Sequence, residues 1–420
     1  MAITIEQALR HIYENAAIKS LKILPIESTL GYVLAQDVIA KHNLPPFDNS
    51  AMDGYAVKCS DAGKSVEVLH TIFAGDDSSA ELHSGHAIKI MTGAKIPAGC
   101  ECIVPIEEVN LISCATSEET LEIKDCIVLP QNLKQNRHIR FCGEDIQKET
   151  LLLTKGQRLH AHHITLLASQ GISHVKVFKK PKIAIFASGN ELKMHFENVE
   201  SHQLYNTNTP TFYSRALELG CEVNFIGTAN DSIEDIRMHI QSALDSDLII
   251  TSGGVSVGDA DFTKEAFGTF GYQIIFDKIE IKPGKPTTFG KIEKTLVLNL
   301  PGNPLAAALN FELFGQSIIL ALSGEESKYI NYIESEIASD YRLKFGRRTL
   351  VPGFFDGKSF TPYKRFSPGM ISPLAVSNSY IIIDENCGLL PEGSKVKVIS
   401  TRFSFTSKEV TSLISCEAGV

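Results

Sequence analysis

The sequence predicts a multidomain α/β protein: a doubly wound domain, an inserted β-rich domain, a helical N-terminal domain and a C-terminal β-barrel-like domain. The chain has 420 residues, which is more than one hydrophobic core normally organises. Residues 181–325 alternate apolar runs of strand length with helical segments, as parallel sheets covered on both faces do. Residues 45–144 and 326–407 instead show short alternating stretches between Gly, Pro and Ser turns, which is typical of β domains.

The domain boundaries are placed where these patterns change. Helical spacing occurs near the N-terminus, as in ITIEQALRHIYENA, and returns after residue 144, so the helical domain is expected to be discontinuous in sequence. The predicted division is a helical domain from 1–44 and 145–180, an inserted β-rich domain from 45–144, a doubly wound domain from 181–325, a C-terminal β domain from 326–407, and a tail from 408–420.

Composition excludes several classes of protein. An apolar content of 43% suits a globular chain, and no stretch approaches the roughly 20 apolar residues of a membrane span. The N-terminus lacks the basic lead and apolar region of an export signal. A net charge of −9 argues against a nucleic-acid binder. The 9 cysteines have irregular spacing without a zinc pattern, so we expect reduced thiols in a soluble, cytoplasmic protein.

The first candidate site is DLIITSGGVSVGDADFTKEAF (247–267), in which a buried strand runs into a glycine-rich turn and then a helix. Glycines let the backbone approach a ligand, and amides at a helix start bind phosphate. Asp261 follows closely enough to hold a magnesium ion beside that phosphate. A glycine turn with an aspartate N-cap explains the same pattern without a ligand. The residues concerned are Gly253, Gly254, Ser256, Gly258 and Asp261.

Two further strand ends carry polar residues. In LNLPGNPLAAALNFEL (298–313), Pro304 suits the first turn of a helix, so the segment also fits a well-capped helix start. In FASGNELK (186–193), Glu191 follows a Ser-Gly-Asn turn. Ligands of doubly wound domains bind beyond the carboxyl ends of the strands, where these turns are expected to meet. The candidate binding residues of the 298–313 segment are Pro301, Gly302, Asn303 and Pro304.

The lysine-rich segment FDKIEIKPGKPTTFG (276–290) lies between these turns in sequence. If it is extended, Lys278 and Lys282 share one face, roughly 13 Å apart, so they could hold two separate anionic groups. A solvated edge strand protected by lysines is the alternative. The PGKP turn leaves the direction of Lys285 open.

The inserted domain contains polar residues in unusual surroundings. PPFDNSAMDGYAV (45–57) mixes Asp and Asn with large apolar residues, and HIRFCGEDI (138–146) gathers Arg140, Glu144 and Asp145. Acids cannot bind an anion directly, but they can hold a metal or a donor-rich ligand. Polar loops at a domain junction would have the same composition, and composition does not decide between the two.

Seven motifs occur in the order found in the molybdopterin molybdenumtransferases, the MoeA family, which also resembles the E domain of gephyrin. The resemblance covers about residues 5–405 and implies an elongated homodimer with clefts built by both subunits. It implies insertion of molybdenum from molybdate into adenylyl-molybdopterin, with release of AMP and a requirement for Mg²⁺. The motifs are PPFDNSAMDGYAV, IMTGA, GEDI, SGNEL, TSGGVSVGDADFTK, IKPGKPTTFG and LPGNPLAAAL.

The resemblance also implies roles for particular residues. Asp261 and Glu191 become the candidate magnesium ligands, and the two strand-end turns become the site of the pterin substrate. Asn190 stands where many members carry Asp, which favours Glu191 as the ligand, and Phe141 and Cys142 stand where members often carry arginines. The implied catalytic residues are Asp53, Thr92, Asp145, Glu191, Lys278 and Lys282, with Asp231, Arg347 and Ser372 at less closely matching positions.

Two other classes of protein are considered as alternatives. A molybdopterin adenylyltransferase is similar to residues 181–325 but lacks the PPFDNSAMDGYAV and IMTGA regions. A gephyrin-like scaffold would bind receptor peptides, and the chain shows no receptor-binding extension. The expected partners are a second copy of the chain, the enzyme that makes adenylyl-molybdopterin, and molybdoenzymes or their chaperones; nucleic acid and membrane are not expected.

Overall fold

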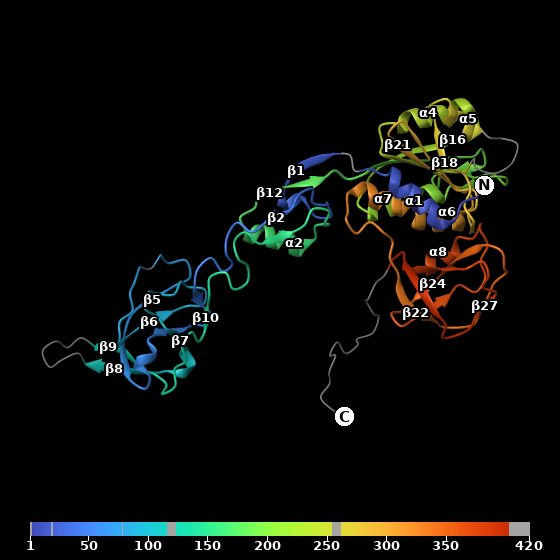
Figure 1. Cartoon of the computed structure of the whole chain (residues 1–420). Coiled ribbons are helices and arrows are strands. Elements are labelled where there is room, and N and C mark those ends of the chain that lie inside the picture. The colour runs from blue at the N-terminus through green and yellow to red at the C-terminus, as the bar shows by residue number, and fades with distance from the viewer. Residues whose placement is uncertain (1, 18–19, 78, 116–122, 254–261, 403–420) are drawn as a thin grey trace. The chain divides into compact units, whose positions relative to one another are not determined.

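The computed structural model describes residues 2–17, 20–77, 79–115, 123–253 and 262–402. The chain forms two compact units, which are coloured by residue number in Figure 1. The larger unit comprises 1–36, 155–161 and 174–420, and the smaller unit comprises 37–154 and 162–173.

The smaller unit is built on a mixed sheet in the order β7-β4-β6-β5-β9-β8. Alternate residues of one strand enter different cores: Tyr55 and Val57 pack in one apolar cluster and Ala56 in another. The bounds are β2 Val38–Ile39, β3 Asn49–Ser50, β4 Gly54–Val57, β5 Ser65–Ile72, β6 His86–Ile90, β7 Cys102–Pro105, β8 Asn110–Ala115, β9 Ile123–Val128, β10 Ile139–Arg140, β11 Leu151–Leu153 and α2 Ala161–Ser169.

The larger unit contains the doubly wound domain that the sequence predicts. Its sheet has the order β16-β13-β17-β21-β20-β18, in which the first four strands are parallel, β20 is antiparallel to β21, and β18 is antiparallel to β20. The strand order reverses beside β13, where such sheets commonly bind ligands. The bounds are β13 Lys182–Ser188, β16 Glu222–Ala229, β17 Leu248–Ser252, β18 Gln273–Phe276, β20 Thr288–Ile292 and β21 Thr295–Leu300.

Helices cover both faces of this sheet. Ile183 and Ile185 pack with Phe212 on one face, whereas Ala184 and Phe186 pack with Ile236 on the other. The helix bounds are α1 Ile5–Asn15, α3 Asn208–Glu218, α4 Ile233–Ala243, α5 Phe262–Gly268, α6 Pro304–Asn310, a π-helical turn Phe311–Gly315 and α7 Gln316–Ser323.

The continuous helix over 304–323 corrects one expectation from the sequence. It is long and apolar enough to cross a membrane, although no stretch was expected to approach that length. In the fold, 89% of its most apolar window is buried, and Leu305, Phe314 and Ile318 lie in the main core. Its apolar surface is therefore accounted for by packing inside the larger unit.

The C-terminal part of the larger unit forms a small barrel, as the sequence predicts. Strands β24, β25, β22, β28 and β26 pair in a closed ring, because β24 pairs with both β25 and β26. Strand β19 Ile281–Lys282 extends from the doubly wound domain and pairs with β24. The bounds are β22 Ile333–Ile337, β24 Arg348–Phe355, β25 Ser359–Pro362, α8 Ser372–Val376, β26 Ser379–Ile383 and β28 Lys395–Ser400.

Three strand pairs and three short 3₁₀ turns complete the described elements. Strand β1 pairs with β12 beside the doubly wound domain, and β14 pairs with β15 at the edge of the candidate site described below. The bounds are β1 Leu21–Pro25, β12 His174–Phe178, β14 Leu192–Lys193, β15 Leu204–Tyr205, β23 Tyr341–Arg342, β27 Leu389–Leu390, and short 3₁₀ turns at Ile26–Ser28, Cys59–Asp61 and Ile106–Glu108.

Candidate functional site

A cavity of about 880 Å³ opens at the carboxyl ends of the parallel strands. We call it the strand-end cavity. Its walls come from the turns after β13, β16, β17 and β21, from the 204–208 segment, and from the 369–371 loop of the C-terminal barrel. Seven residues predicted to be functional line it together: Glu191, Asp231, Gly253, Pro301, Gly302, Asn303 and Pro304.

The turn after β17 requires glycine at its first position. Gly253 has φ +95°, and a Cβ atom there would lie 2.3 Å from the carbonyl oxygen of Ser188. A Cβ atom on Gly302 would be 3.8 Å from the Gly253 Cα. The turns after β13, β17 and β21 therefore meet with backbone against backbone, which is the arrangement that the glycine pattern predicts.

The two acidic residues of the cavity come from neighbouring turns. Asp231 accepts a hydrogen bond from the Asn190 amide (3.1 Å), and Asn190 Oδ1 accepts one from the Asp231 amide (3.0 Å). The backbone and the side chain of Asn190 thus hold the Asp231 turn against the Glu191 turn. A carboxylate at 190 would stand next to Asp231 instead, so the Asn that departs from the family pattern removes one negative charge from this rim.

The start of α6 does not offer free amides at its first turn. The amide groups of Leu305 and Ala306 donate to the carbonyl oxygen of Pro368, over 3.0 and 3.3 Å. Pro368 belongs to the loop of the C-terminal barrel whose Gly369 and Ile371 line the cavity. The loop therefore caps the helix and forms a wall at the same time, and phosphate binding by these two amides is not supported.

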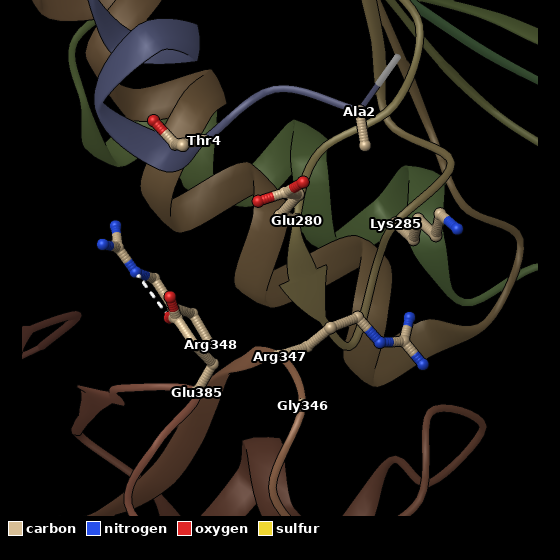
Figure 2. A pocket seen from close by; sticks show the side chains of 8 residues that line it. All are labelled: Ala2, Thr4, Glu280, Lys285, Gly346, Arg347, Arg348 and Glu385. Carbon is tan, nitrogen blue, oxygen red and sulfur yellow. Dashed lines mark hydrogen bonds and ion pairs between the residues drawn. The ribbon is translucent and has the colours of Figure 1, made fainter.

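A second pocket of about 310 Å³ lies where the N-terminal segment, the turns around β19 and the start of β24 meet. We call it the arginine pocket (Figure 2). Arg348 donates to Glu6 and to Glu385 (3.1 Å), and the Glu6 carboxylate holds the pKa of Arg348 above its ordinary value. The lining residues are Ala2, Thr4, Glu280, Lys285, Gly346, Arg347, Arg348 and Glu385.

Lys285 and Arg347 are the two cations of this pocket that make no ion pair with another described residue. Figure 2 shows their side chains extending to the side opposite the Arg348–Glu385 pair. The turn that carries Lys285 is fixed by the buried Asn310, whose Nδ2 donates to the Pro283 carbonyl (3.0 Å). Thr287 Oγ1 donates to Asn310 Oδ1 (3.1 Å), so both sides of the turn are held.

Lys278 and Lys282 do not line either cavity as described, and Ser372 does not either. Ile279 and Ile281 are buried, but the segment is not one extended strand. Ile279 bridges to Ile3, and the Ile281 amide donates to the Ile279 carbonyl, so the chain bends between them. The bend follows from pairing with two different partners, the N-terminal segment and β24.

The predicted residues of the inserted domain belong to the smaller unit. Asp53 Oδ1 accepts hydrogen bonds from the Thr92 amide and hydroxyl, both at 2.7 Å, and these bonds hold the pKa of Asp53 below its ordinary value. Asp145 is exposed and follows β10 in the sequence. The Cys142 amide donates to Asp48 (2.7 Å) of the 45–57 segment, and the Phe141 amide donates to Glu144 (2.9 Å).

Gly254, Ser256, Gly258 and Asp261 lie outside the described residues. The lining residues that were not predicted include Asn206, Asn208 and Ser252, and all three are buried. The segment YNTNTP (205–210) has Asn and Thr at the start of a helix, where these residue types are typical of helix caps, so the sequence gives no separate signal for a ligand site. Ser252 is part of the TSGG motif, in which only the two glycines were predicted to contact a ligand.

Comparisons with known proteins agree with this architecture. Three family models match in order: the "MoeA N-terminal region (domain I and II)" over residues 3–171, the "Probable molybdopterin binding domain" over 184–321 and the "MoeA C-terminal region (domain IV)" over 335–401. The strand-end cavity lies mostly within the second match and takes Gly369 and Ile371 from the third.

Similar chains carry consistent names. The molybdopterin molybdenumtransferase of Haemophilus influenzae is 34% identical over 406 residues, which is 94% of this chain and 98% of that protein. The molybdopterin molybdenumtransferase of Bacillus subtilis is 32% identical and the match spans 95% of this chain and 94% of that one. The crystal structure of the molybdopterin biosynthesis MoeA protein from Pyrococcus horikosii has a TM-score of 0.81 at 28% identity, covering 95% of this chain and 99% of that one.

Proposed function

The chain belongs to the molybdopterin molybdenumtransferase (MoeA) family, and on that premise we propose that it inserts molybdenum from molybdate into adenylyl-molybdopterin and releases AMP. The observation that carries the proposal is the pairing of two differently built sites in the larger unit. The strand-end cavity offers amides, hydroxyls and two carboxylates, and the arginine pocket offers two cations without ion-pair partners among the described residues.

We assign the pterin substrate to the strand-end cavity because of its size and its lining. A volume of about 880 Å³ suits a ligand with a pterin, two phosphates and a nucleoside. Gly253 and Gly302 both line this cavity, so their backbone atoms contribute to its wall.

We assign molybdate to the arginine pocket. Molybdate is a small oxyanion, and a guanidinium and an ammonium group bind such ions through charge-assisted hydrogen bonds. Arg348 is neutralised by Glu6 and Glu385, which leaves Arg347 and Lys285 for the substrate anion. Lys278 and Lys282 keep their proposed roles from the family resemblance, but they lie outside the described lining of both cavities.

Magnesium dependence is part of the proposal, and the carboxylates suit it. Mg²⁺ is usually held by one or two carboxylates together with substrate phosphates and water, and Glu191 and Asp231 both line the cavity. Within the described ranges no group of three or more metal-ligating side chains occurs, so substrate oxygens would complete the set. When bound, the ion would neutralise charge that builds on the phosphates as AMP leaves.

A homodimer in the cytoplasm is also proposed. In the family resemblance both subunits build one cleft, and here Asp53, Thr92 and Asp145 belong to a separate compact unit from Glu191 and Asp231. Mixing Asp53→Asn chains with Glu191→Gln chains should restore part of the lost activity if the two residues serve one cleft from different subunits. A confirmed heterodimer without any recovery would argue for sites built within one chain.

The experiment that tests the reaction uses the purified full chain with adenylyl-molybdopterin, molybdate and Mg²⁺, without ATP. We expect AMP release and formation of a cofactor that activates a cofactor-free molybdoenzyme. Addition of EDTA should slow AMP release if the magnesium proposal is correct. A requirement for ATP and molybdopterin would favour the adenylyltransferase, and the absence of both activities would favour the scaffold.

A further inference from the structure

Asn208 connects the two turns that form the wall of the strand-end cavity. It is the first residue of α3, lines the cavity and is only 8% exposed. Its side-chain Nδ2 donates to Ser252 Oγ and to the Gly302 carbonyl oxygen, each over 2.7 Å. One residue from a helix thus bonds to the last residue of β17 and to the turn after β21.

These bonds act where the sheet itself no longer connects the two turns. The parallel pairing of β17 with β21 ends at Ser252 and Leu300. Past this point the Gly253 amide reaches the Leu300 carbonyl only over 3.4 Å, and Ser252 Oγ donates to the Pro301 carbonyl over 3.2 Å. Among the described residues beyond this point, the shortest hydrogen bonds that connect the two strand ends are those of Asn208, and they fix the spacing between Ser252 and Gly302.

A helix cap does not explain this side chain. The N-cap of α3 is Thr207, and it makes no side-chain hydrogen bond to the helix. Asn208 likewise donates to residues of other elements and not to its own helix. Because both hydrogens of Nδ2 are engaged, the remaining polar atom is the Oδ1 acceptor, for which no partner occurs among the described residues.

We propose that Asn208 is a positioning residue for adenylyl-molybdopterin, which holds the Gly253 and Gly302 turns at the separation that the substrate requires. The inference rests on the proposed function and adds to it a residue that neither the glycine pattern nor the motif resemblance identifies. Asn208 acts through the two turns, so its loss weakens pterin binding and leaves the arginine pocket unchanged.

Thr251 provides a matched control. Its Oγ1 donates to Asn299 Oδ1 over 2.6 Å, so it also makes a buried hydrogen bond between β17 and β21, one position before Ser252. Thr251 does not line the strand-end cavity. Thr251→Val therefore removes a comparable bond between the same strands and leaves the turns connected through Asn208.

The test measures equilibrium binding of adenylyl-molybdopterin to the full chain by dialysis, together with KM values for both substrates. In Asn208→Ala we expect the dissociation constant and the KM for adenylyl-molybdopterin to rise about tenfold, which corresponds to about 1.4 kcal/mol. The KM for molybdate should stay within about twofold. Asn208→Asp should bind more weakly than Asn208→Ala, because a carboxylate cannot donate and repels phosphate. Thr251→Val should bind as the wild type does.

Three results would overturn the inference. They are unchanged pterin binding in Asn208→Ala, an equal loss in Thr251→Val, and parallel rises in the KM values of pterin and molybdate. If Asn208→Ala does not fold, Ser252→Ala removes the same connection from the other side, and unchanged binding in that variant would overturn the inference too. Failure of the wild type to bind adenylyl-molybdopterin would instead reject the proposed function.

Discussion

The strand-end cavity and the arginine pocket lie in the same unit but are built from different chemistry. No basic side chain occurs in the described lining of the strand-end cavity, which contains backbone, amide and hydroxyl groups, some apolar side chains, and the carboxylates of Glu191 and Asp231. The arginine pocket is lined by Lys285, Arg347 and Arg348. The first site presents polar groups and carboxylates to a ligand, and the second presents cations as well.

This difference indicates how an acidic chain can accept two anionic substrates. With a net charge of −9, the long-range field repels anions, so attraction must come from local groups. A large substrate can be recognised at many uncharged contacts, because each hydrogen bond adds a little. A small oxyanion has few contacts, and each has to be charge-assisted to give comparable affinity.

The largest expected effect is on the free energy of unfolding, when the ion pair that anchors helix α3 is removed. Arg215 on α3 makes a bidentate ion pair with Glu312 of the π-helical turn, with distances of 2.7 and 2.9 Å. Burial raises the pKa of Glu312, and the Arg215 hydrogen bonds oppose that rise. Arg215→Ala leaves a buried carboxylate unpaired, so we expect a loss of about 3–5 kcal/mol in the free energy of unfolding, measured by urea denaturation.

Arg348→Ala is the matched control for that prediction. Its partners Glu6 and Glu385 are exposed, and exposed ion pairs contribute about 0–1 kcal/mol. Similar losses of stability in the two variants would mean that burial does not make the Arg215 ion pair more important for stability than the Arg348 ion pairs.

The second prediction removes one of the two cations of the arginine pocket that make no ion pair with another described residue. Arg347→Ala should raise the KM for molybdate by about ten- to a hundredfold, since hydrogen bonds to charged groups contribute about 1.5–3 kcal/mol. Binding of adenylyl-molybdopterin should change much less, and the rise in KM should shrink at high salt because exposed charges are screened. If pterin binding weakens as strongly as molybdate use, the two sites are not separate.

The architecture follows from the sequence where side-chain periodicity determines it. Strands β13 and β21 coincide with the apolar runs KIAIFAS and TLVLNL, because strands buried on both faces leave few alternatives. Membership of the family was likewise recognisable from ordered motifs. The predicted domain boundaries stay predictions.

The candidate site was less predictable, for a physical reason. Glycine turns are visible in sequence because only glycine tolerates the backbone of Gly253. Asn208 and Asn310 act across long sequence separations, on Gly302 and Pro283, and no local pattern records such bonds. The direction of Lys285 was open in sequence for the same reason, since Asn310 on another element fixes its turn.

The third prediction follows from this parallel between the two asparagines. Asn310→Ala should raise the KM for molybdate about threefold to tenfold, because the Lys285 turn loses its bonds at Pro283 and Thr287 and about 1 kcal/mol of positioning is removed. The dissociation constant of adenylyl-molybdopterin should be nearly unchanged, opposite to Asn208→Ala. A variant that shifts both substrates equally would show that Asn310 only stabilises the fold.

The smallest effect is expected in the smaller unit, where an exposed acid is held by a single neighbour. Thr92 donates both its amide and its hydroxyl to Asp53, so the folded carboxyl titrates below its ordinary pKa. A lowered pKa means that this stabilisation is present above the ordinary value and is lost as pH falls through the folded value. Thr92→Val removes the hydroxyl and keeps the amide, so the pKa of Asp53 should rise part of the way.

Carbon-13 NMR of labelled aspartate in the full chain measures this shift directly. Thr92→Ser is the control, because it keeps the hydroxyl and should leave the pKa of Asp53 near the wild-type value. If Thr92→Val and Thr92→Ser titrate alike, the amide alone sets the charge of Asp53. Thr92 would then act through its backbone, and its predicted catalytic role would not depend on its side chain.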